Sequence, residues 1–470
     1  MRVSLTVFMV ASGLSVFAVA DQPVFRAGAA KTDITPPKGV SLDGTISKNG
    51  PVRGVNDRLA SRAVVLDDGR TQLAIVVNDA CMIGQSVYDK AKSLAQRGSG
   101  IPSECMLMCA THSHAAVRAM HIGTEPVDDE YHERLARQMA AAVIQAHQRL
   151  APAQIGFGSL EKPDLFACRR FLCEPGTVSA NPFGETDERV KSVAGSSTGV
   201  IRPAGPIDPQ LSIVSVRHAD GAPLAVLANY SPHYCGGYRR SWVSADYFGA
   251  FARRVEEELA TDTPHPSPVA MMSNGTSGDS GATKLKGQFA PFERLEKVGN
   301  GLAEDVLKAI GQMEHGVPEQ LAACHSEMEL GVRLPDEARV TWAKSVLANP
   351  DAKKPHRWTP IFAREALELN EYPPRYKIVL QALRLGDIRI AAIPCEVFGE
   401  TGLAIKRQSP APRTFVMELA NGYSGYLPTP EQHRWGGYET WPARSSYLEV
   451  EAEPKIRAES LRLLRQLGME

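Results

Sequence analysis

Hydrophobic residues in this chain fall into short continuous runs, which are separated by turns that contain Gly or Asp. Paired runs predict three β-hairpins, at residues 62–79, 211–229 and 378–394. The second run of each pair is almost entirely apolar, which is typical of a strand buried on both faces. We therefore expect sheets at the centre of the molecule, covered on both sides.

A second pattern, an apolar stripe with a period of 3.6 residues, predicts helices at 128–150, 245–259, 292–313 and 451–467. Because these helices alternate with the hairpins, we expect an α/β fold class with mixed β-sheets and flanking helices. Between Cys173 and Pro209 the hydrophobic pattern gives way to Gly, Ser, Pro and Asn, which predicts a long loop over the active face, or a linker. We favour the loop, because the hairpins on both sides of it are needed for one core.

The first twenty residues predict a secretory signal peptide. Arg2 supplies the positive charge, an apolar stretch follows, and Ala18-Val19-Ala20 forms an A-x-A cleavage site. A retained membrane anchor is the alternative. We expect residues 21–470 to form a single large catalytic domain that is periplasmic or secreted.

Composition narrows the class of partner. The 52 Lys and Arg residues balance 53 Asp and Glu residues, and no basic block stands out, which argues against a nucleic-acid partner. Eight cysteines are few for an exported chain of this size. We expect most of them to be buried thiols rather than zinc ligands, although Cys168 and Cys173 could close a small loop.

Residues with metal-binding chemistry follow three of the predicted strands. His112 and His114 come directly after the apolar run 106–110, and an extended segment would point both imidazoles the same way. His233 and Glu396 each follow another apolar strand. Because α/β folds place ligands at the carboxyl ends of strands, these residues are candidates for one site.

Two imidazoles and one carboxylate form a donor set that suits zinc and leaves a position for water. Spacing alone also allows histidines hydrogen-bonded near the core, or an acid at a helix N-terminus. A further cluster, Asn421–Pro430 followed by Tyr438, alternates aromatic with small residues, as a pocket-lining loop does. Surface aromatics packed on a helix are the alternative for this cluster.

Gly278-Asp279-Ser280-Gly281 matches a motif of chymotrypsin-type serine proteases. Those enzymes also need an upstream histidine in an Ala-Ala-His-Cys-like segment, within a double β-barrel. This chain has Ala110-Thr111-His112-Ser113 there and a helix-rich layout, so we do not expect a protease.

Taken together, these motifs resemble those of the neutral/alkaline (non-lysosomal) ceramidase family, in its N-terminal catalytic domain. The resemblance runs from the strand at Ala27-Gly28 to Tyr438. Thr111 to His114 match the family's Thr-His-Thr-His, and His233 matches its strand-end histidine. The remaining matches are Pro394-Cys395-Glu396 for Pro-Gly-Glu, and Tyr423, Tyr426 and Tyr438 for three tyrosines.

The resemblance implies a zinc-dependent amidohydrolase that cleaves ceramide-like lipids to a fatty acid and a sphingoid base. It implies that zinc is held by His112, His233, Glu396 and Tyr426. It also implies that the substrate amide is lined by His114, Tyr438 and Arg169, with Arg170 as the alternative arginine. Zinc would activate a water, His114 would orient it or protonate the leaving nitrogen, and Tyr438 and Arg169 would stabilise the oxyanion. The expected partner is a small-molecule or lipid amide, with peripheral membrane contact.

Three departures from the family pattern keep other substrates open. The family's catalytic serine falls on Gly281, with Ser280 one position early. Its Gly-Pro-Gly-Gly is here Ala115-Ala116-Val117-Arg118, and the chain ends soon after Tyr438, without the C-terminal β-sandwich of full-length ceramidases. The alternatives are a zinc hydrolase of another amide or ester on the same scaffold, and a catalytically degenerate binding protein.

Overall fold

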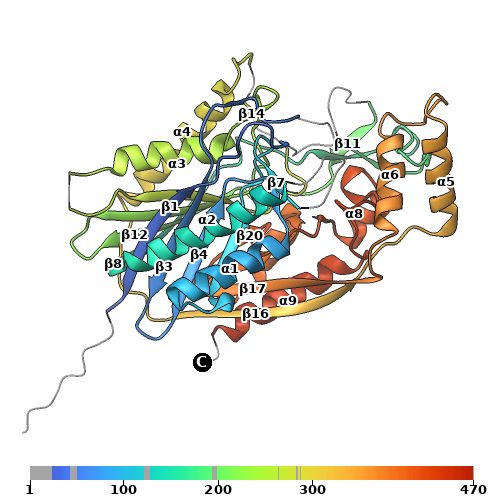
Figure 1. Ribbon diagram of the computed structural model, residues 1–470. Helices are drawn as coiled ribbons and strands as arrows, with labels where there is room; N and C mark the ends of the chain where they lie inside the picture. The colour runs from blue at the N-terminus through green and yellow to red at the C-terminus, as the bar shows by residue number, and fades with distance from the viewer. Residues whose placement is uncertain are drawn as a thin grey trace, which may run out of the picture.

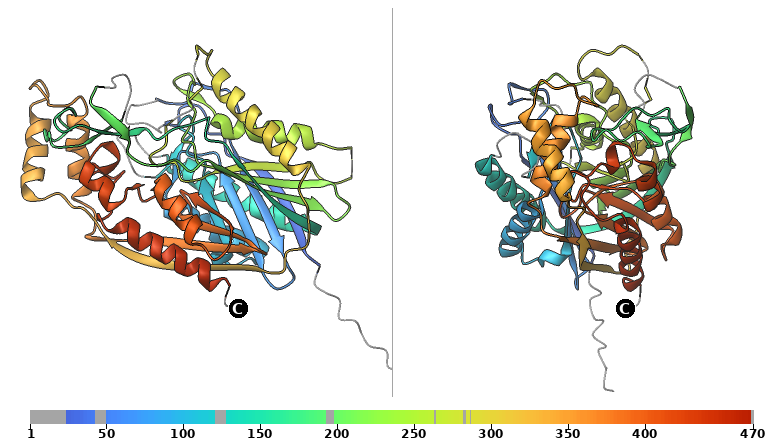
Figure 2. Two further views of the ribbon diagram at one scale, coloured as in Figure 1. Left: turned by 180° about the vertical axis from the view of Figure 1, so that it is seen from behind. Right: turned by 90° about the vertical axis from the view of Figure 1, so that its right-hand side faces the viewer.

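The computed structural model describes residues 24–42, 50–120, 128–192, 198–262, 264–281, 284–285 and 287–468. Two sheets packed face to face occupy its centre, and helices cover the outer side of each sheet (Figures 1 and 2). The predicted signal peptide lies outside the described residues and stays a prediction. Within the described ranges, no helix combines the length and the apolar character needed to cross a membrane.

The larger sheet has eight strands in the order β15-β13-β12-β8-β1-β3-β4-β6. The predicted hairpins at 62–79 and 211–229 are confirmed as the antiparallel pairs β3–β4 and β12–β13. The strands are β1 (Arg26–Asp33), β3 (Ala60–Asp67), β4 (Gln72–Asn78), β6 (Met106–Ala110), β8 (Ala151–Glu161), β12 (Gln210–His218), β13 (Pro223–Tyr230) and β15 (Val269–Asn274).

The two halves of this sheet join only at the amino ends of β1 and β8. These strands pair at two positions, Arg26 with Pro152 and Ala27 with Ala151, and then run away from the junction. On one side β4 is parallel to β6, and on the other β13 is parallel to β15. All four of these strands therefore point their carboxyl ends away from the junction.

The smaller sheet has four strands in the order β16-β17-β18-β20. The predicted hairpin at 378–394 is confirmed as β17–β18, and β18 is parallel to β20. Apolar side chains alternate along the strands, and those on the facing sides of the two sheets, such as Leu107 and Phe415, form one core. The strands are β16 (Leu321–Gly331), β17 (Arg375–Leu385), β18 (Ile388–Ile393) and β20 (Arg413–Glu418).

Helices pack on the outer faces of both sheets. The larger sheet carries α1 (Gln85–Ser99) and α2 (Asp129–Gln148) on one half, and α3 (Asp246–Leu259) and α4 (Glu293–Ile310) on the other. The smaller sheet carries α7 (Gly399–Gln408) and α9 (Ala452–Gln466). The four predicted helices are confirmed as α2, α3, α4 and α9.

Two further helices, α5 (Glu337–Ala348) and α6 (Thr359–Leu369), follow β16 and precede β17 in the chain. They pack against each other at one end of the molecule (Figure 1). The short elements of the described residues are β2 (Gly54–Val55), β5 (Met82–Ile83), β7 (Arg118–Ala119), β14 (Trp242–Val243), β19 (Glu396–Val397), β21 (Tyr426–Leu427) and α8 (Pro430–Trp435), with 3-10 turns at Ser103–Cys105 and Tyr438–Thr440.

The segment between Cys173 and Pro209 differs from the loop that its composition predicts. It contributes β10 (Val190–Ser192) and β11 (Val200–Pro203), which flank β9 (Arg170–Cys173) in a small sheet. These strands are only three and four residues long and mostly exposed, so they carry no apolar pattern. Six of the eight cysteines are buried, as expected for most of them, and Cys168 and Cys173 are not bonded to each other in the structure.

Candidate active site

Three segments that follow strands of both sheets converge on one buried point. His112 follows β6, His233 follows β13, and Glu396 follows β18. One ligand atom from each lies within 4.8 Å of the other two, and all three side chains are almost fully buried. The structure thus brings together the three predicted ligands that come from separate strand ends.

The extended conformation predicted for the segment His112–His114 is wrong, although the two imidazoles do lie close together. His112 has φ of +64°, in the left-handed region, so the segment is a turn and not an extended strand. Histidine enters this region more readily than most residues. The turn is fixed by hydrogen bonds from Thr111 N to Asn78 O (3.0 Å) and from Ser113 Oγ to Ser244 O (2.7 Å). It places the two Nε2 atoms 3.1 Å apart.

Hydrogen-bond partners determine which nitrogen of each imidazole is available to a ligand. His112 Nδ1 lies 2.9 Å from the carbonyl oxygen of Cys81, and His233 Nδ1 lies 3.1 Å from that of Ser277. A carbonyl only accepts, so each ring carries a proton on Nδ1 and leaves Nε2 as the nitrogen that can bind a metal once it is deprotonated. This is the arrangement of metal-binding histidines.

The carboxylate of Glu396 completes this group. Its Oε2 atom is buried and, among the described residues, receives no hydrogen bond, while Tyr423 Oη donates to Oε1 at 2.8 Å. A buried carboxylate oxygen in this position needs a cation. Although burial disfavours an imidazolium, the Glu396 carboxylate raises the pKa of His112 well above its usual value. The residues present therefore fit a divalent metal ion.

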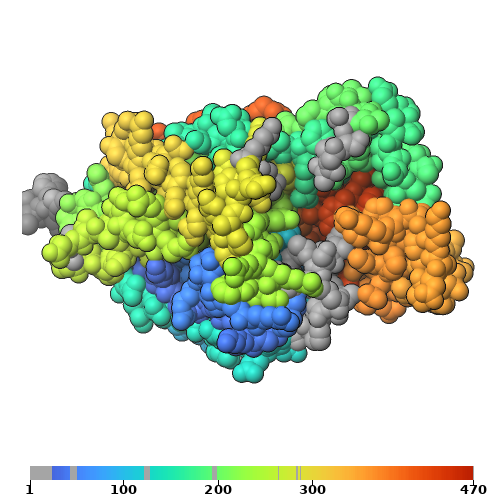
Figure 3. Space-filling model, turned by 90° about the horizontal axis from the view of Figure 1, so that it is seen from above, coloured from blue at the N-terminus to red at the C-terminus, as the bar shows by residue number. Residues whose placement is uncertain are grey.

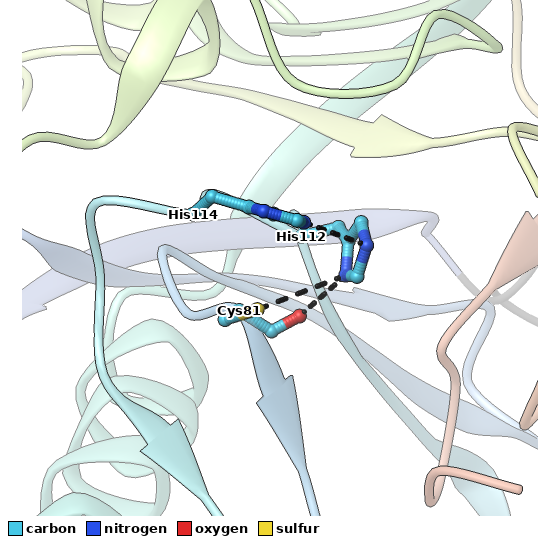
Figure 4. A group of neighbouring side chains, drawn as sticks. All are labelled: Cys81, His112 and His114. Atoms are coloured by element: carbon cyan, nitrogen blue, oxygen red, sulfur yellow. Dashed lines mark hydrogen bonds between the residues drawn. The ribbon is translucent and has the colours of Figure 1, made fainter. Parts of the chain in front are cut away.

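A second group of possible ligands, Cys81, His112 and His114, shares one histidine with the first (Figure 4). Cys81 Sγ lies 4.0 Å from His112 Nδ1, the nitrogen that already donates to the Cys81 carbonyl. His114 and Glu396 lie on the Nε2 side of the same ring. The set of His112, His233 and Glu396 is therefore the better metal site.

Glu418, at the end of β20, connects the segments that carry two of these ligands. Its carboxylate accepts hydrogen bonds from Val397 N (2.7 Å), from Ser277 N (3.2 Å) and from Ser277 Oγ. Val397 follows Glu396, and Ser277 contacts His233 Nδ1. Burial raises the pKa of Glu418 to about 8. Sequence reasoning missed Glu418, although it ends an apolar strand as Glu396 does.

The protease-like motif has a structural role. Asp279 Oδ1 accepts a hydrogen bond from Gly399 N (2.9 Å) at the first residue of α7, where a carboxylate is favourable. Ser280 Oγ accepts from His233 N (2.9 Å) and lies 3.0 Å from the carbonyl oxygen of Ser231. The motif thus fixes the backbone that carries His233.

The predicted substrate-facing residues form the other side of the site. Glu396 and Tyr426 are paired positions of β19 and β21, so their side chains project from the same face. Arg169 donates through Nη2 to Tyr426 Oη (3.1 Å) and through Nε to Glu439 Oε1 (2.8 Å). Burial, followed by the Glu396 charge, raises the pKa of Tyr426 well above its usual value. The ring of Tyr438 lies edge-on to that of Tyr426, with the centroids 5.7 Å apart.

The structure distinguishes the two candidate arginines. Arg170 is fully buried and donates to Glu439, to Gln432 Oε1 and to the carbonyl oxygen of Gly436. Its donors thus hold the segment before Tyr438, whereas Arg169 reaches the phenol of Tyr426. Arg169 is therefore the arginine that reaches the candidate site.

His114 has one neighbour that sequence reasoning missed. The ring of Tyr234 stacks on its imidazole, with centroids 3.7 Å apart and an interplanar angle of 18°. Burial, with smaller effects from His112 and Arg169, lowers the pKa of His114 well below its usual value. His114 is therefore neutral. Its position directly after His233 is the signal that could have identified Tyr234.

Comparisons with known proteins address the family and the fold of the chain. The family model described as neutral/alkaline non-lysosomal ceramidase, N-terminal, matches residues 25–291. The neutral ceramidase of Pseudomonas aeruginosa is 22% identical over 519 residues, covering 91% of this chain and 70% of that protein. Its crystal structure superposes with a TM-score of 0.69 at 17% identity, covering 95% of this chain and 75% of the other. A ceramidase complexed with C2 gives the same TM-score at 16% identity. The predicted fold class is confirmed.

Proposed function

The chain belongs to the neutral/alkaline non-lysosomal ceramidase family, a family of hydrolases, and on that premise we propose that it is a zinc-dependent hydrolase of the N-acyl amide bond of ceramide-like lipids. The products would be a fatty acid and a sphingoid base. The observation that carries the proposal is the buried convergence of His112, His233 and Glu396, with Oε2 of Glu396 lying 3.3 Å from Nε2 of His112. The likeness to the P. aeruginosa neutral ceramidase supports the substrate class.

In this proposal zinc is held by His112, His233, Glu396 and Tyr426. Two imidazoles and a carboxylate are a usual catalytic zinc set. When bound, the metal supplies an activated water and polarises the carbonyl group. The Tyr426 oxygen accepts a hydrogen bond from Arg169, and its remaining lone pair would serve as the fourth ligand.

The remaining residues act on the amide. His114 is neutral, so it can accept a proton and pass it to the leaving nitrogen. Arg169 and Tyr438 would donate to the oxyanion, and Glu439 keeps the Arg169 side chain in place from the side opposite the substrate. We also propose that the chain is exported through the signal peptide at residues 1–20 and meets its substrate at a membrane surface.

A hydrolase of a different amide or ester is the second candidate. It is favoured by Gly281, which lacks the side chain that the family motif has at this position. An ester or a more reactive amide has a better leaving group and needs less assistance from an additional hydroxyl.

The test is hydrolysis of a fluorescent long-chain ceramide by purified mature protein, with chelator and with zinc added back. We expect chelator-sensitive cleavage that zinc restores. The His114→Ala variant should lose the activity and retain the metal, whereas His218→Ala, which alters a buried histidine of β12, should retain both. Zinc-loaded protein that cleaves short amides or esters but no ceramide would favour the second candidate.

A further inference from the structure

Aromatic side chains extend without interruption from the candidate active site to the α5–α6 helix pair. The ring of Tyr438, which faces Tyr426, also contacts Trp358 and Trp441, at centroid distances of 5.6 and 6.0 Å. Trp441 in turn contacts Phe362 of α6 at 5.2 Å. This aromatic cluster therefore joins the site to an element that the active centre itself does not need.

Two members of this cluster differ from the rest in exposure. Phe362 and Trp441 are buried, whereas Tyr438 and Trp358 are half-buried and adjacent. Figure 3 shows a hollow in one face of the molecule, with dark red residues of the C-terminal part at its floor and the orange α5–α6 pair as one wall. The guanidinium of Arg357 lies over the Trp358 ring at 4.8 Å, and the same ring contacts Tyr438. Trp358 and Tyr438 thus present an apolar surface beside the site.

Several polar contacts hold the α5–α6 helix pair in place without the Trp358 side chain. The pair is held by Thr359 Oγ1, which donates to the carbonyl oxygen of Pro182 (2.8 Å), and by the ion pair of Arg444 with Glu365 (2.7 Å). Arg339 adds an ion pair with Glu185 (2.8 Å). These contacts do not involve the Trp358 indole. Its ring also contacts His356 and Trp441, and it keeps an intermediate exposure, so only the remaining part of its surface can meet a ligand.

A hydrocarbon chain has the chemistry that suits this surface. Aromatic rings offer apolar area with few polar groups, and burial of each CH₂ of a hydrocarbon chain against them is favourable. The acyl chain of an amide begins at the carbonyl carbon, the atom that Tyr438 would face. An acyl chain leaving the reaction centre on the Tyr438 side would therefore pass directly over Trp358.

We propose that Trp358 and Tyr438 form the binding surface for the acyl chain of the substrate, so that the α5–α6 helix pair determines chain-length preference. This inference rests on the proposed function. It assigns Trp358 as a specificity-determining residue that contacts the chain and takes no part in bond cleavage.

The test compares N-acyl amides of one fluorescent amine with acyl chains of 2 and 16 carbons. We expect Trp358→Ala to raise KM for the 16-carbon amide at least tenfold, with KM for the 2-carbon amide and both kcat values within twofold of wild type. Trp342→Ala is the matched control, because Trp342 lies on the same helix pair and contacts Phe183. It should change neither KM, and Trp358→Phe should restore most of the long-chain preference.

A second measurement separates failure of this inference from failure of the proposed function. Palmitate and acetate are titrated against tryptophan fluorescence, a binding assay that requires no hydrolysis. If the wild type cleaves no acyl amide but binds palmitate, and Trp358→Ala loses that binding, the surface stands and the proposed function falls. Equal effects of Trp358→Ala at both chain lengths, or unchanged palmitate binding, overturn the inference. If Trp358→Ala does not fold, Trp358→Gln replaces it, and failure of both variants to fold shows that Trp358 is structural and also overturns it.

Discussion

The Oε2 atom of Glu396 lies 3.3 Å from Nε2 of His112. Nδ1 of His112 faces the Cys81 carbonyl, so Nε2 is the ring nitrogen that faces the carboxylate. The Glu396 carboxylate, acting against burial, raises the pKa of His112 well above its usual value, so either a proton on Nε2 or a metal ion balances the buried negative charge. The pair therefore defines a position for positive charge.

We predict that His112→Ala and His233→Ala each abolish stoichiometric metal binding, because either change removes one of the two imidazoles that share the metal site with Glu396. Metal content is measured by elemental analysis after dialysis. His218→Ala serves as the control and should keep its metal. Full metal content in either ligand variant would reject the site.

Glu418→Ala should weaken metal affinity by about 10- to 100-fold. Alanine removes the group that accepts from Val397 N, Ser277 N and Ser277 Oγ, so the segments that carry Glu396 and His233 lose a common support. Affinity is measured by competition with a chelator. Glu453→Ala removes another buried carboxyl group, one that accepts from Thr401, and should leave affinity unchanged. Equal affinity in the two variants would contradict a positioning role for Glu418.

Substituting lysine for each arginine in turn should distinguish the role of Arg169 from that of Arg170. In Arg169→Lys the donor to Tyr426 is lost, and kcat should fall by about 10²- to 10³-fold with little change in stability. In Arg170→Lys the buried bonds to Gln432 and Gly436 are lost, which should lower the free energy of unfolding by about 1–3 kcal/mol. Denaturant unfolding and steady-state kinetics check both. A larger loss of kcat in Arg170→Lys than in Arg169→Lys would assign the substrate contact to Arg170.

Gly281→Ser should fold and should increase ceramide hydrolysis at least tenfold. A Cβ at this position would meet the Ala167 carbonyl oxygen at 3.3 Å and Arg169 Cβ at 3.5 Å, so small shifts accommodate it, and the hydroxyl would lie beside Arg169. The rate on ceramide is compared with that on a short-chain ester. An unchanged ceramide rate in the folded variant would show that this hydroxyl is not what limits the reaction.

Asp279 makes stability depend on pH. Burial raises its pKa to about 6 from an ordinary 3.8, so between these values the folded state holds a proton that the unfolded state has released. The Asp279 contribution to stability therefore falls as pH rises from about 4 to about 6. Asp279→Asn keeps an acceptor for Gly399 N and removes the titration. As pH rises from about 4 to about 6, the free energy of unfolding of Asp279→Asn should rise relative to that of the wild type by up to about 3 kcal/mol.

Thermal or denaturant unfolding at several pH values measures this difference. Asp387→Asn changes an exposed carboxylate and should run parallel to the wild type. A constant difference between Asp279→Asn and the wild type would place the pKa of Asp279 near its ordinary value.

The sequence predicted the strands and helices whose apolar residues recur in a regular pattern. Runs such as Leu73 to Val77 identified strands because both faces of the larger sheet are covered, by helices on one side and by the smaller sheet on the other. The strands β10 and β11 could not be predicted, because exposed strands of three or four residues have no apolar period to detect.

Site residues were predictable where a polar side chain ends an apolar strand, as His233 and Glu396 do. The positive φ of His112 was not, because it depends on contacts with Asn78 and Ser244 that only the folded chain supplies. The stacking of Tyr234 on His114 likewise joins two segments that no local pattern relates.

The narrow junction of β1 with β8 also has a consequence for the order of folding. His112 belongs to one half of the larger sheet, His233 to the other, and Glu396 to the smaller sheet. No single half or sheet can thus supply the whole set of His112, His233 and Glu396, and closing such distant contacts is a slow step. Metal uptake should accordingly report the last stage of assembly, and nascent or truncated chains should compete poorly for the ion.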